Sequence, residues 1–281
     1  MCLPFFGRPA CERMMPNLKI LTACVFLLTS LAAASAQEIV TLPTRPDVTQ
    51  SYFIASLPKE QRAIAVLFPG GEGLLRLRQE GGQVKFSPNN FLVRVRADFV
   101  KRGVIAVLVD APSDSQSRGM SDEFRLGEKH FTDISAIVND LGKRFPGVPI
   151  FLVGTSRGTI SAAALGARFG SEISGVVLTS TLFRQAGARV SEPGLSRFDF
   201  ATIKAPLLFV HHVSDGCAVT PYSDAARLSG KYPLISVSGG RSPESGPCDP
   251  FSAHGYFGKE TEAVEQIVNW MLKKPFRDKV E

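Results

Sequence analysis

Residues 148–158 read Val-Pro-Ile-Phe-Leu-Val-Gly-Thr-Ser-Arg-Gly and lead into a run of small residues with helical spacing. The apolar run indicates a buried strand, the G-x-S-x-G pattern a tight turn, and the residues after it a helix. Ser156 lies at the tip of this turn, beside the free N–H groups of the helix N-terminus. Glycine at positions 154 and 158 has a steric reason, because a Cβ this close to a strained turn would clash. The stretch predicts an exposed serine between a strand and a helix.

Buried apolar runs and helical patterns alternate on both sides of this turn. The expected strands are residues 39–42, 51–55, 63–68, 104–109, 150–153, 176–179, 207–210 and 234–237. The expected helices are residues 91–102, 131–145, 159–169, 221–228 and 264–271. This alternation predicts an α/β fold with a mostly parallel central sheet and helices on both faces. Ligands of such sheets bind beyond the carboxyl ends of the strands.

The first 36 residues have the pattern of a signal peptide. Lys19 supplies a positive charge, residues 20–31 form an apolar stretch, and Ala34-Ser35-Ala36 is a small-x-small cleavage signal. The apolar stretch is shorter than a membrane span requires. We therefore expect cleavage after Ala36, a periplasmic or secreted mature protein, and no stable membrane span.

Removal of this segment leaves residues 37–281 as a single domain, large enough for a substantial core. Residues 1–13 lie outside the signal pattern, so a translation start at Met14 or Met15 stays open. Loss of three cations and one anion lowers the formal charge from +6 to +4. This weak positive balance argues against nucleic acid as a partner. We expect a monomer.

A serine hydroxyl becomes a good nucleophile only when a base takes its proton and a third group orients that base. Of the four histidines, His254 has the right setting, in a loop between the last expected strand and the last helix. His130 begins a long amphipathic helix, where a surface or capping role is expected. His211 and His212 end a buried strand. A structural role is expected for both, and the alternative that one of them lines the site stays open.

The orienting acid should follow the carboxyl end of a strand that neighbours the strand of the serine. Asp215 follows the expected strand 207–210 in this way. Asp249 is the rival because it is close to His254 in sequence, although a Pro/Gly-rich segment surrounds it. We favour Asp215, since the chain order Ser156, Asp215, His254 is the order in α/β-hydrolase sheets.

With these residues the sequence resembles the α/β-hydrolase fold family, from about Ala63 to Leu272. The resemblance implies a serine hydrolase that works through an acyl-enzyme, with Ser156 as nucleophile, His254 as base and Asp215 as its partner. It implies a small acyl substrate, and no cofactor or metal is expected. An esterase is the favoured subclass.

The resemblance also implies an oxyanion hole made by two backbone N–H groups. One belongs to Arg157, directly after the nucleophile. The other comes from the loop of residues 69–73, Pro-Gly-Gly-Glu-Gly, in which Gly71 is favoured and Gly70 is next. Many esterases carry His-Gly where this chain has Pro-Gly. The Arg157 side chain either reaches a substrate carboxylate or packs in a salt bridge, and both alternatives stay open.

Members of the fold often carry a large lid between Ser180 and Pro206, but this interval is short here. Little or no cap domain is therefore expected, and no interfacial activation. Seven Arg and Lys side chains lie between residues 76 and 102. We interpret them as a solvated face, with binding of an anionic substrate or an acidic envelope surface as the alternative.

Two of the five cysteines, Cys217 and Cys248, follow the expected cleavage site. Two cysteines in an exported chain predict one disulfide. Such a bond would tie the loop of Asp215 to the loop of His254 and hold their geometry steady.

An envelope acyltransferase and a peptidase would use the same three residues, so both stay as alternatives to an esterase. A non-catalytic binding protein on this fold would usually have lost a member of the triad. This chain keeps all three candidates, which disfavours a purely binding role.

Overall fold

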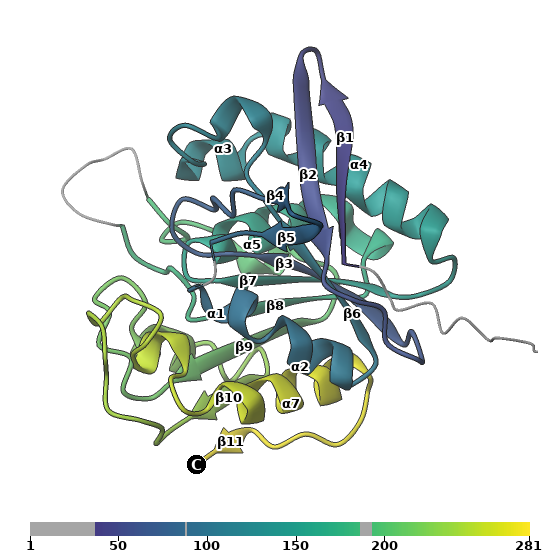
Figure 1. Ribbon diagram of the computed structural model, residues 1–281. Helices are drawn as coiled ribbons and strands as arrows, with labels where there is room; N and C mark the ends of the chain where they lie inside the picture. Colours follow the sequence, from purple (N-terminus) through teal and green to yellow (C-terminus); the bar gives the residue numbers. More distant parts are fainter. Residues whose placement is uncertain (1–36, 88, 186–192) are drawn as a thin grey trace, which may run out of the picture. The chain divides into compact units, whose positions relative to one another are not determined.

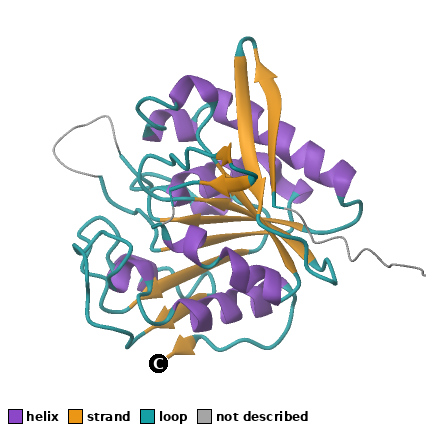
Figure 2. Cartoon of the chain, viewed as in Figure 1, coloured by secondary structure: helices purple, strands orange, loops and turns teal. Residues whose placement is uncertain are grey.

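The computed structural model describes residues 37–87, 89–185 and 193–281 (Figure 1). The expected signal peptide, residues 1–36, lies outside the described residues. The described chain forms a nine-stranded sheet, a separate two-stranded hairpin and seven α-helices (Figure 2). The strands are β1 (Glu38–Arg45), β2 (Val48–Ile54), β3 (Ala63–Phe68), β4 (Arg78–Glu80), β5 (Gln83–Lys85), β6 (Val104–Val109), β7 (Ile150–Thr155), β8 (Gly175–Thr179), β9 (Leu207–His212), β10 (Leu234–Val237) and β11 (Lys279–Val280). The helices are α1 (Phe91–Arg94), α2 (Arg96–Lys101), α3 (Asp122–Leu126), α4 (Glu128–Arg144), α5 (Gly158–Phe169), α6 (Tyr222–Ala226) and α7 (Glu260–Met271).

The strand order of the large sheet is β1-β2-β6-β3-β7-β8-β9-β10-β11. β1 pairs with β2, and β2 with β6, in antiparallel fashion. All pairs from β6 to β11 are parallel. The mostly parallel sheet expected from the sequence is thus confirmed. One detail is wrong: β8 lies between β7 and β9, so the strand before Asp215 does not neighbour the strand of the serine.

Side chains of the central strands alternate between two cores, one on each face of the sheet. In β7, Ile150 and Leu152 belong to the core beneath α4 and α5, whereas Phe151 and Val153 face the core beneath α1, α2 and α7. Both helix layers are visible in Figure 1. Because both faces are covered, the central strands read as unbroken apolar runs rather than alternating ones.

Some elements depart from the expected pattern. The helical stretch 91–102 is divided into α1 and α2 at Val95, which has φ −90° and ψ 3°. α3, the β4–β5 hairpin and β11 are additional, and the three strands among them are only two or three residues long. The described residues of the interval 180–206 contain only the 3₁₀ turn Phe200–Thr202, which agrees with a small cap. Residues 186–192 of that interval lie outside the described residues.

Candidate active site

Ser156 occupies a strained turn between β7 and α5. Its φ is +51°, in a region that residues other than glycine rarely adopt, and its N–H donates to the carbonyl of Thr179 at the end of β8 (3.0 Å). A Cβ at Gly154 would lie 2.5 Å from the carbonyl oxygen of Gly158. A Cβ at Gly158 would lie 2.1 Å from the carbonyl oxygen of Phe68. Both glycines therefore have a steric reason, and the serine sits at the carboxyl edge of the sheet.

A cavity of about 220 Å³ opens beside Ser156. Its wall includes His254, Gly70, Gly71 and Asn90. Gly70 approaches the serine so closely that a Cβ on it would lie 3.0 Å from the Ser156 Cβ. The fold thus brings the loop after β3, the turn after β7 and the segment after β10 to one cavity.

The His254 ring is held by a carboxylate and a hydroxyl. Its Nδ1 lies 3.0 Å from Oδ2 of Asp215, whose side chain is fully buried. Thr220 Oγ1 donates to the same Oδ2 (2.9 Å) and lies 3.1 Å from His254 Nδ1. The Cys217 N–H donates to the other oxygen, Asp215 Oδ1 (2.9 Å). Because Nδ1 faces the carboxylate, Nε2 faces away from it and can accept a proton.

Asp249, the alternative acid, makes no hydrogen bond to His254 in the described structure. Its Oδ2 accepts instead from the N–H of Gly246 (3.1 Å). Asp249 is exposed and lines the cavity. Its carboxylate is therefore available to contact a ligand but does not orient the imidazole.

Ser156 and His254 line the same cavity without a hydrogen bond between Ser156 Oγ and His254 Nε2 in the described structure. Neither atom is a buried polar atom without a partner. Hydrogen bonds between a nucleophile and its base often tighten only when substrate binds. Proton transfer between the two groups therefore requires them to come closer, as substrate binding would bring about.

The backbone around His254 is tied to the sheet by Ser180 and Tyr256. Ser180 Oγ donates to the His254 carbonyl (2.8 Å). The Tyr256 hydroxyl donates to the Val210 carbonyl (2.6 Å) and accepts from the Ser180 N–H (3.0 Å). Burial raises the pKa of Tyr256 above its ordinary value, so the hydroxyl stays protonated and keeps its role as a donor.

Two further links hold the same segment. Cys217 and Cys248 form a disulfide, which is the pairing expected from the cysteine count. Cys217 is buried, whereas Cys248 is exposed and lines the cavity. On the other side of the segment, Arg94 donates to the Gly255 carbonyl (3.1 Å) and pairs with Glu260 (2.8 Å). The position of the histidine is thus set by contacts on several sides.

The glycine loop after β3 offers a backbone donor beside Ser156. The Gly70 carbonyl accepts from the N–H of Gly73 (3.2 Å). In a trans peptide the N–H points opposite to the carbonyl, so the Gly71 N–H points away from Gly73. No hydrogen bond in the described structure uses the N–H of Gly70 or of Gly71. Gly71 has φ +59°, which glycine adopts without strain.

The Arg157 side chain binds a carboxylate of the protein itself. Its Nε donates to Oδ1 of Asp122 (2.8 Å), and the Asp122 side chain is 1% exposed. Of the two alternatives left open by the sequence, the structure shows the salt bridge. The backbone of Arg157 follows Ser156 directly, between the elbow and the start of α5.

The expectation that His130 has a surface or capping role is wrong. His130 is fully buried against the rings of Phe68 and Phe124, and neither ring nitrogen has a hydrogen-bond partner. Burial lowers the pKa of His130 to about 3. The apolar face of α4 extends over its first turn, so this position faces the core.

His211 and His212 serve the backbone. His211 Nε2 accepts from the Thr181 N–H (2.8 Å), and burial lowers the pKa of His211 to about 3. His212 Nε2 lies 3.0 Å from the Gly239 carbonyl oxygen. Neither residue lines the cavity beside Ser156, and both have the structural role expected.

Sequence reasoning missed Thr220, Ser180, Tyr256 and Asp122. Ser180 follows a buried strand directly, which is the signal that singled out Asp215, and the same rule could have found it. The other three lie in irregular or short segments with no periodicity. Their partners are distant in sequence, so no local pattern marks them.

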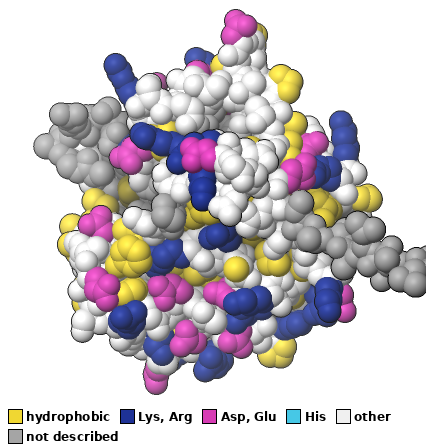
Figure 3. Space-filling view, in the orientation of Figure 1, with side chains coloured by type: hydrophobic (Ala, Val, Ile, Leu, Met, Phe, Trp, Pro, Cys, Tyr) yellow, Lys and Arg dark blue, Asp and Glu magenta, His cyan; other side chains and the backbone are white. Residues whose placement is uncertain are grey.

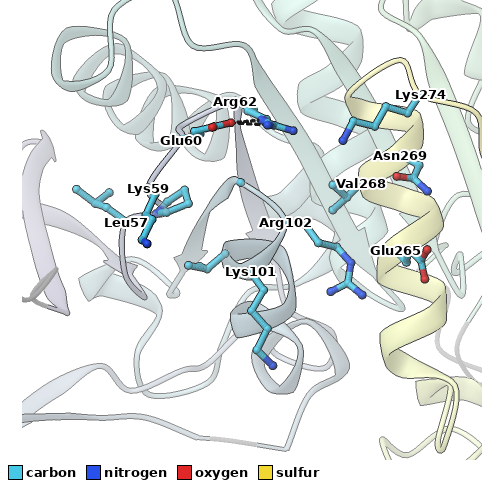
Figure 4. A pocket seen from close by; sticks show the side chains of 13 residues that line it. Leu57, Lys59, Glu60, Arg62, Lys101, Arg102, Glu265, Val268, Asn269 and Lys274 are labelled. Atoms are coloured by element: carbon cyan, nitrogen blue, oxygen red, sulfur yellow. Dashed lines mark hydrogen bonds and ion pairs between the residues drawn. The ribbon is translucent and has the colours of Figure 1, made fainter.

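A larger cavity, of about 1040 Å³, lies at the other edge of the sheet, before β3 and β6 (Figure 4). Its cationic side chains are Lys59, Arg62, Lys101, Arg102 and Lys274. Glu60 pairs with Arg62, and Asp98 with Lys101 (3.3 Å). No histidine or serine of the described chain lines this cavity, so it lacks the nucleophile and base that the smaller cavity has.

The arginine-rich stretch is largely paired. Arg78 forms an ion pair with Glu80, and Arg96 packs over the ring of Phe86 (4.8 Å to its centre). Figure 3 shows basic and acidic side chains interspersed over this face of the described chain. These observations favour a solvated face over a dedicated anion site.

Within residues 37–87, 89–185 and 193–281, no group of three or more His, Cys, Asp or Glu side chains is arranged to hold a metal ion. No helix of that part of the chain is long and apolar enough to cross a membrane.

Comparison with known proteins agrees with this fold. XC6422 of Xanthomonas campestris, described as an α/β serine hydrolase without a lid, has a TM-score of 0.55 at 17% identity, over 83% of this chain and 95% of that one. Est1E of Butyrivibrio proteoclasticus gives 0.56 at 18% identity, over 84% and 99%. A soluble variant of the monoglyceride lipase of Saccharomyces cerevisiae gives 0.56 at 12% identity, over 86% and 96%. No curated protein matches the sequence.

A family model described as serine aminopeptidase, S33, matches residues 90–231. The match spans half of the 281 residues and includes Ser156 and Asp215, whereas His254 and the glycine loop lie outside it. The chain therefore belongs to the S33 serine aminopeptidase family of α/β hydrolases.

Proposed function

We propose that this serine hydrolase cleaves a carboxylic ester through an acyl-enzyme, with Ser156 as nucleophile, His254 as base and Asp215 as the group that orients the base. One observation carries the proposal: Ser156 and His254 share one cavity while His254 Nδ1 lies 3.0 Å from the buried Asp215 carboxylate. This arrangement supports a nucleophile, a base and an orienting acid, and the Ser156–His254 hydrogen bond is expected to form when substrate binds.

Acylation begins when His254 Nε2 takes the hydroxyl proton of Ser156 while Oγ attacks the ester carbonyl carbon. The N–H groups of Gly71 and Arg157 donate to the oxyanion, and each such donor typically contributes about 3 kcal/mol. When the carbonyl reforms, the C–O bond to the alcohol breaks and His254 protonates the leaving oxygen. Water then attacks acyl-Ser156 as its proton passes to His254, and that proton returns to Ser156 Oγ as the acid leaves.

The cavity size supports a short acyl group. At about 220 Å³ it is smaller than the roughly 300–1,000 Å³ of pockets for drug-sized ligands. Acetyl to butyryl esters should therefore be preferred over long-chain esters. A kcat/KM that keeps rising for acyl chains longer than about eight carbons, twice the length of butyrate, would contradict this part of the proposal.

Cleavage of an aminoacyl substrate is a second candidate, which Asp249 favours. Its exposed carboxylate lines the cavity and would attract the ammonium group of an amino-terminal residue. A panel of amino-acid p-nitroanilides, run beside p-nitrophenyl acetate, separates the two candidates. In the aminopeptidase case the Asp249→Asn variant should lose anilide turnover selectively, mainly through a higher KM.

Labelling with a fluorophosphonate tests the nucleophile directly. Wild-type protein should carry one adduct on the peptide that contains Ser156, and Ser156→Ala should carry none. Ser229→Ala is the matched control, because Ser229 is exposed and its Oγ donates only to the Ala226 carbonyl (2.8 Å). Folded wild-type protein that neither labels nor turns over any ester of the panel would overturn the proposal.

We also propose that residues 1–36 are removed on export to the periplasm or the medium. The Cys217–Cys248 disulfide supports an oxidising compartment. Amino-terminal sequencing of protein from the extracytoplasmic fractions should begin at Gln37. Recovery of the full chain in the cytoplasm, with both thiols reduced, would contradict export.

A further inference from the structure

Arg125 of α3 is buried, with 1% of its surface exposed, and makes no direct ion pair in the described part of the chain. Its Nη1 donates to Ser161 Oγ (2.9 Å) and its Nη2 to the Gly71 carbonyl (3.0 Å). Burial lowers the pKa of Arg125 to about 10, which still leaves the side chain charged near neutral pH. The carboxylates of Asp122 and Glu72 act on this charge only without direct contact. A buried cation with no ion pair is costly, so its two hydrogen bonds call for an explanation.

These hydrogen bonds join the two segments that carry the proposed oxyanion donors. Gly71 belongs to the loop after β3, and Ser161 lies in α5, the helix that begins directly after Arg157. The loop is shaped to admit the guanidinium. At Gly73, which has φ +73°, a Cβ would lie 2.4 Å from Met120 Cε and 2.8 Å from Arg125 Nη2. A side chain at position 73 would therefore press on both Met120 and Arg125.

Together with the N–H of Gly73, Arg125 fixes the conformation of Gly71. The Gly70 carbonyl, on one side of Gly71, is bound by the N–H of Gly73 (3.2 Å). The Gly71 carbonyl, on the other side, is bound by Arg125. When both flanking peptides are fixed, the backbone dihedrals of this glycine are fixed too, although glycine by itself is free to adopt many.

Asp122 lies three residues before Arg125, so the two side chains are neighbours on one face of α3. Asp122 Oδ1 accepts from Arg157 Nε (2.8 Å), and Oδ2 accepts from the N–H of Gly194 (2.9 Å). Thus one short helix contacts the residue of each proposed donor: Gly71 through Arg125, and Arg157 through Asp122.

We propose that α3 is a clamp that sets the distance between the two donors of the oxyanion hole, with Arg125 and Asp122 as positioning residues. The inference rests on the proposed function, because it concerns the donors of that reaction. Such donors act only when they lie about 2.7–3.1 Å from the oxyanion. A glycine loop cannot hold that distance alone, whereas a buried guanidinium bonded to the loop and to α5 can.

Arg125→Met removes both hydrogen bonds and keeps most of the side-chain volume. We expect kcat/KM for p-nitrophenyl acetate to fall about 10- to 100-fold, mostly in kcat, which is less than the outright loss of one donor. The Ki of a trifluoromethyl ketone, which forms a tetrahedral adduct with the serine, should rise by the same factor. The KM for the ester should change little, since the neutral ground-state carbonyl depends less on these donors than the oxyanion does. Arg125→Lys, which keeps a charged donor, should recover part of the loss.

The control is Ile267→Val in α7, on the other face of the sheet, which lowers stability modestly and should leave the Ki of the ketone unchanged. Should Arg125→Met fail to fold, Ser161→Ala and Asp122→Asn provide the same measurements. Folded variants whose kcat/KM and ketone Ki match the control would overturn the clamp and leave the proposed function standing. Wild-type protein without fluorophosphonate labelling at Ser156 would overturn both.

Discussion

Removal of the Cys217–Cys248 disulfide should lower both stability and turnover. The bond joins residues 31 positions apart. On one side, the Cys217 N–H donates to Asp215 Oδ1 (2.9 Å). On the other side, Cys248 lies six residues before His254 in a Pro/Gly-rich segment. The Cys217→Ser/Cys248→Ser double variant therefore frees the loop of the acid from the loop of the base.

The size of the stability loss follows from the length of the closed loop. In the chain-entropy model, a loop of 31 residues loses about 12 cal/mol/K in the unfolded state, which is about 3.7 kcal/mol at 25 °C. For a domain of this size the loss corresponds to a Tm lower by about 7–15 °C. A misplacement of 1 Å can reduce turnover about 100-fold, so a smaller loosening of the Asp215–His254 contact should lower kcat about tenfold.

Thermal unfolding and p-nitrophenyl acetate kinetics, measured at a temperature where both proteins are folded, test the two parts separately. Dithiothreitol should shift the wild-type protein toward the double variant, because Cys248 is exposed, and should not affect the double variant. A Tm within about 2 °C of wild type would refute the entropic estimate. A large Tm loss with unchanged kcat would refute the coupling to the Asp–His pair.

Three further substitutions probe the same framework. His130→Phe should reduce acid sensitivity. The pKa of His130 is lowered to about 3, so its neutral form contributes stability that is present above about pH 6.5 and lost as pH falls toward 3. Measured by urea unfolding, the drop in the free energy of unfolding from pH 7 to pH 5 should be about 2 kcal/mol smaller in the variant than in wild type. Thr220→Val should lower kcat about three- to tenfold with little change in KM, because Asp215 loses a donor. The exposed Thr202→Val is the kinetic control. Equal kcat values for the Thr220→Val and Thr202→Val variants would contradict this role. Gly158→Ala should cost about 3 kcal/mol or more through its backbone clash, whereas Gly142→Ala, with open space at its Cβ, should be neutral or stabilising in thermal unfolding.

Features that depend on periodicity were accessible from the sequence. The buried strands β3, β6 and β7 read as unbroken apolar runs because helices cover both faces of the sheet. The turn at Ser156 could be predicted because steric crowding requires both of its glycines, and they lie within five residues of each other. The order of neighbouring strands was not, since β8 enters between β7 and β9 and no local pattern records which strands pair.

Features that depend on single polar contacts were not accessible. α3 is five residues long, too short for a helical period to show. Thr220 binds Asp215 through one hydroxyl, and no pattern distinguishes it from any other threonine in a loop. His130 shows the converse error. A histidine in the first turn of an amphipathic helix reads as polar, yet a neutral imidazole can be buried when aromatic rings surround it.

The conformation of the loops at the carboxyl edge of the sheet is fixed by buried polar groups rather than by the apolar core. Apolar packing determines where β3, β6 and β10 end, but a loop beyond a strand end can still adopt many conformations. Asp110, at the end of β6, accepts from the backbone N–H groups of residues 75, 76 and 77 and thereby orders the chain after the glycine loop. Arg125 does the same for Gly71, and Ser180 for His254. Each of these groups is costly to bury alone and stabilising only when its partner is in place. Substitutions at these positions should therefore reduce kcat by a larger factor than core substitutions that lower Tm equally. If kcat plotted against Tm fell on one line for both kinds of variant, that distinction would be refuted.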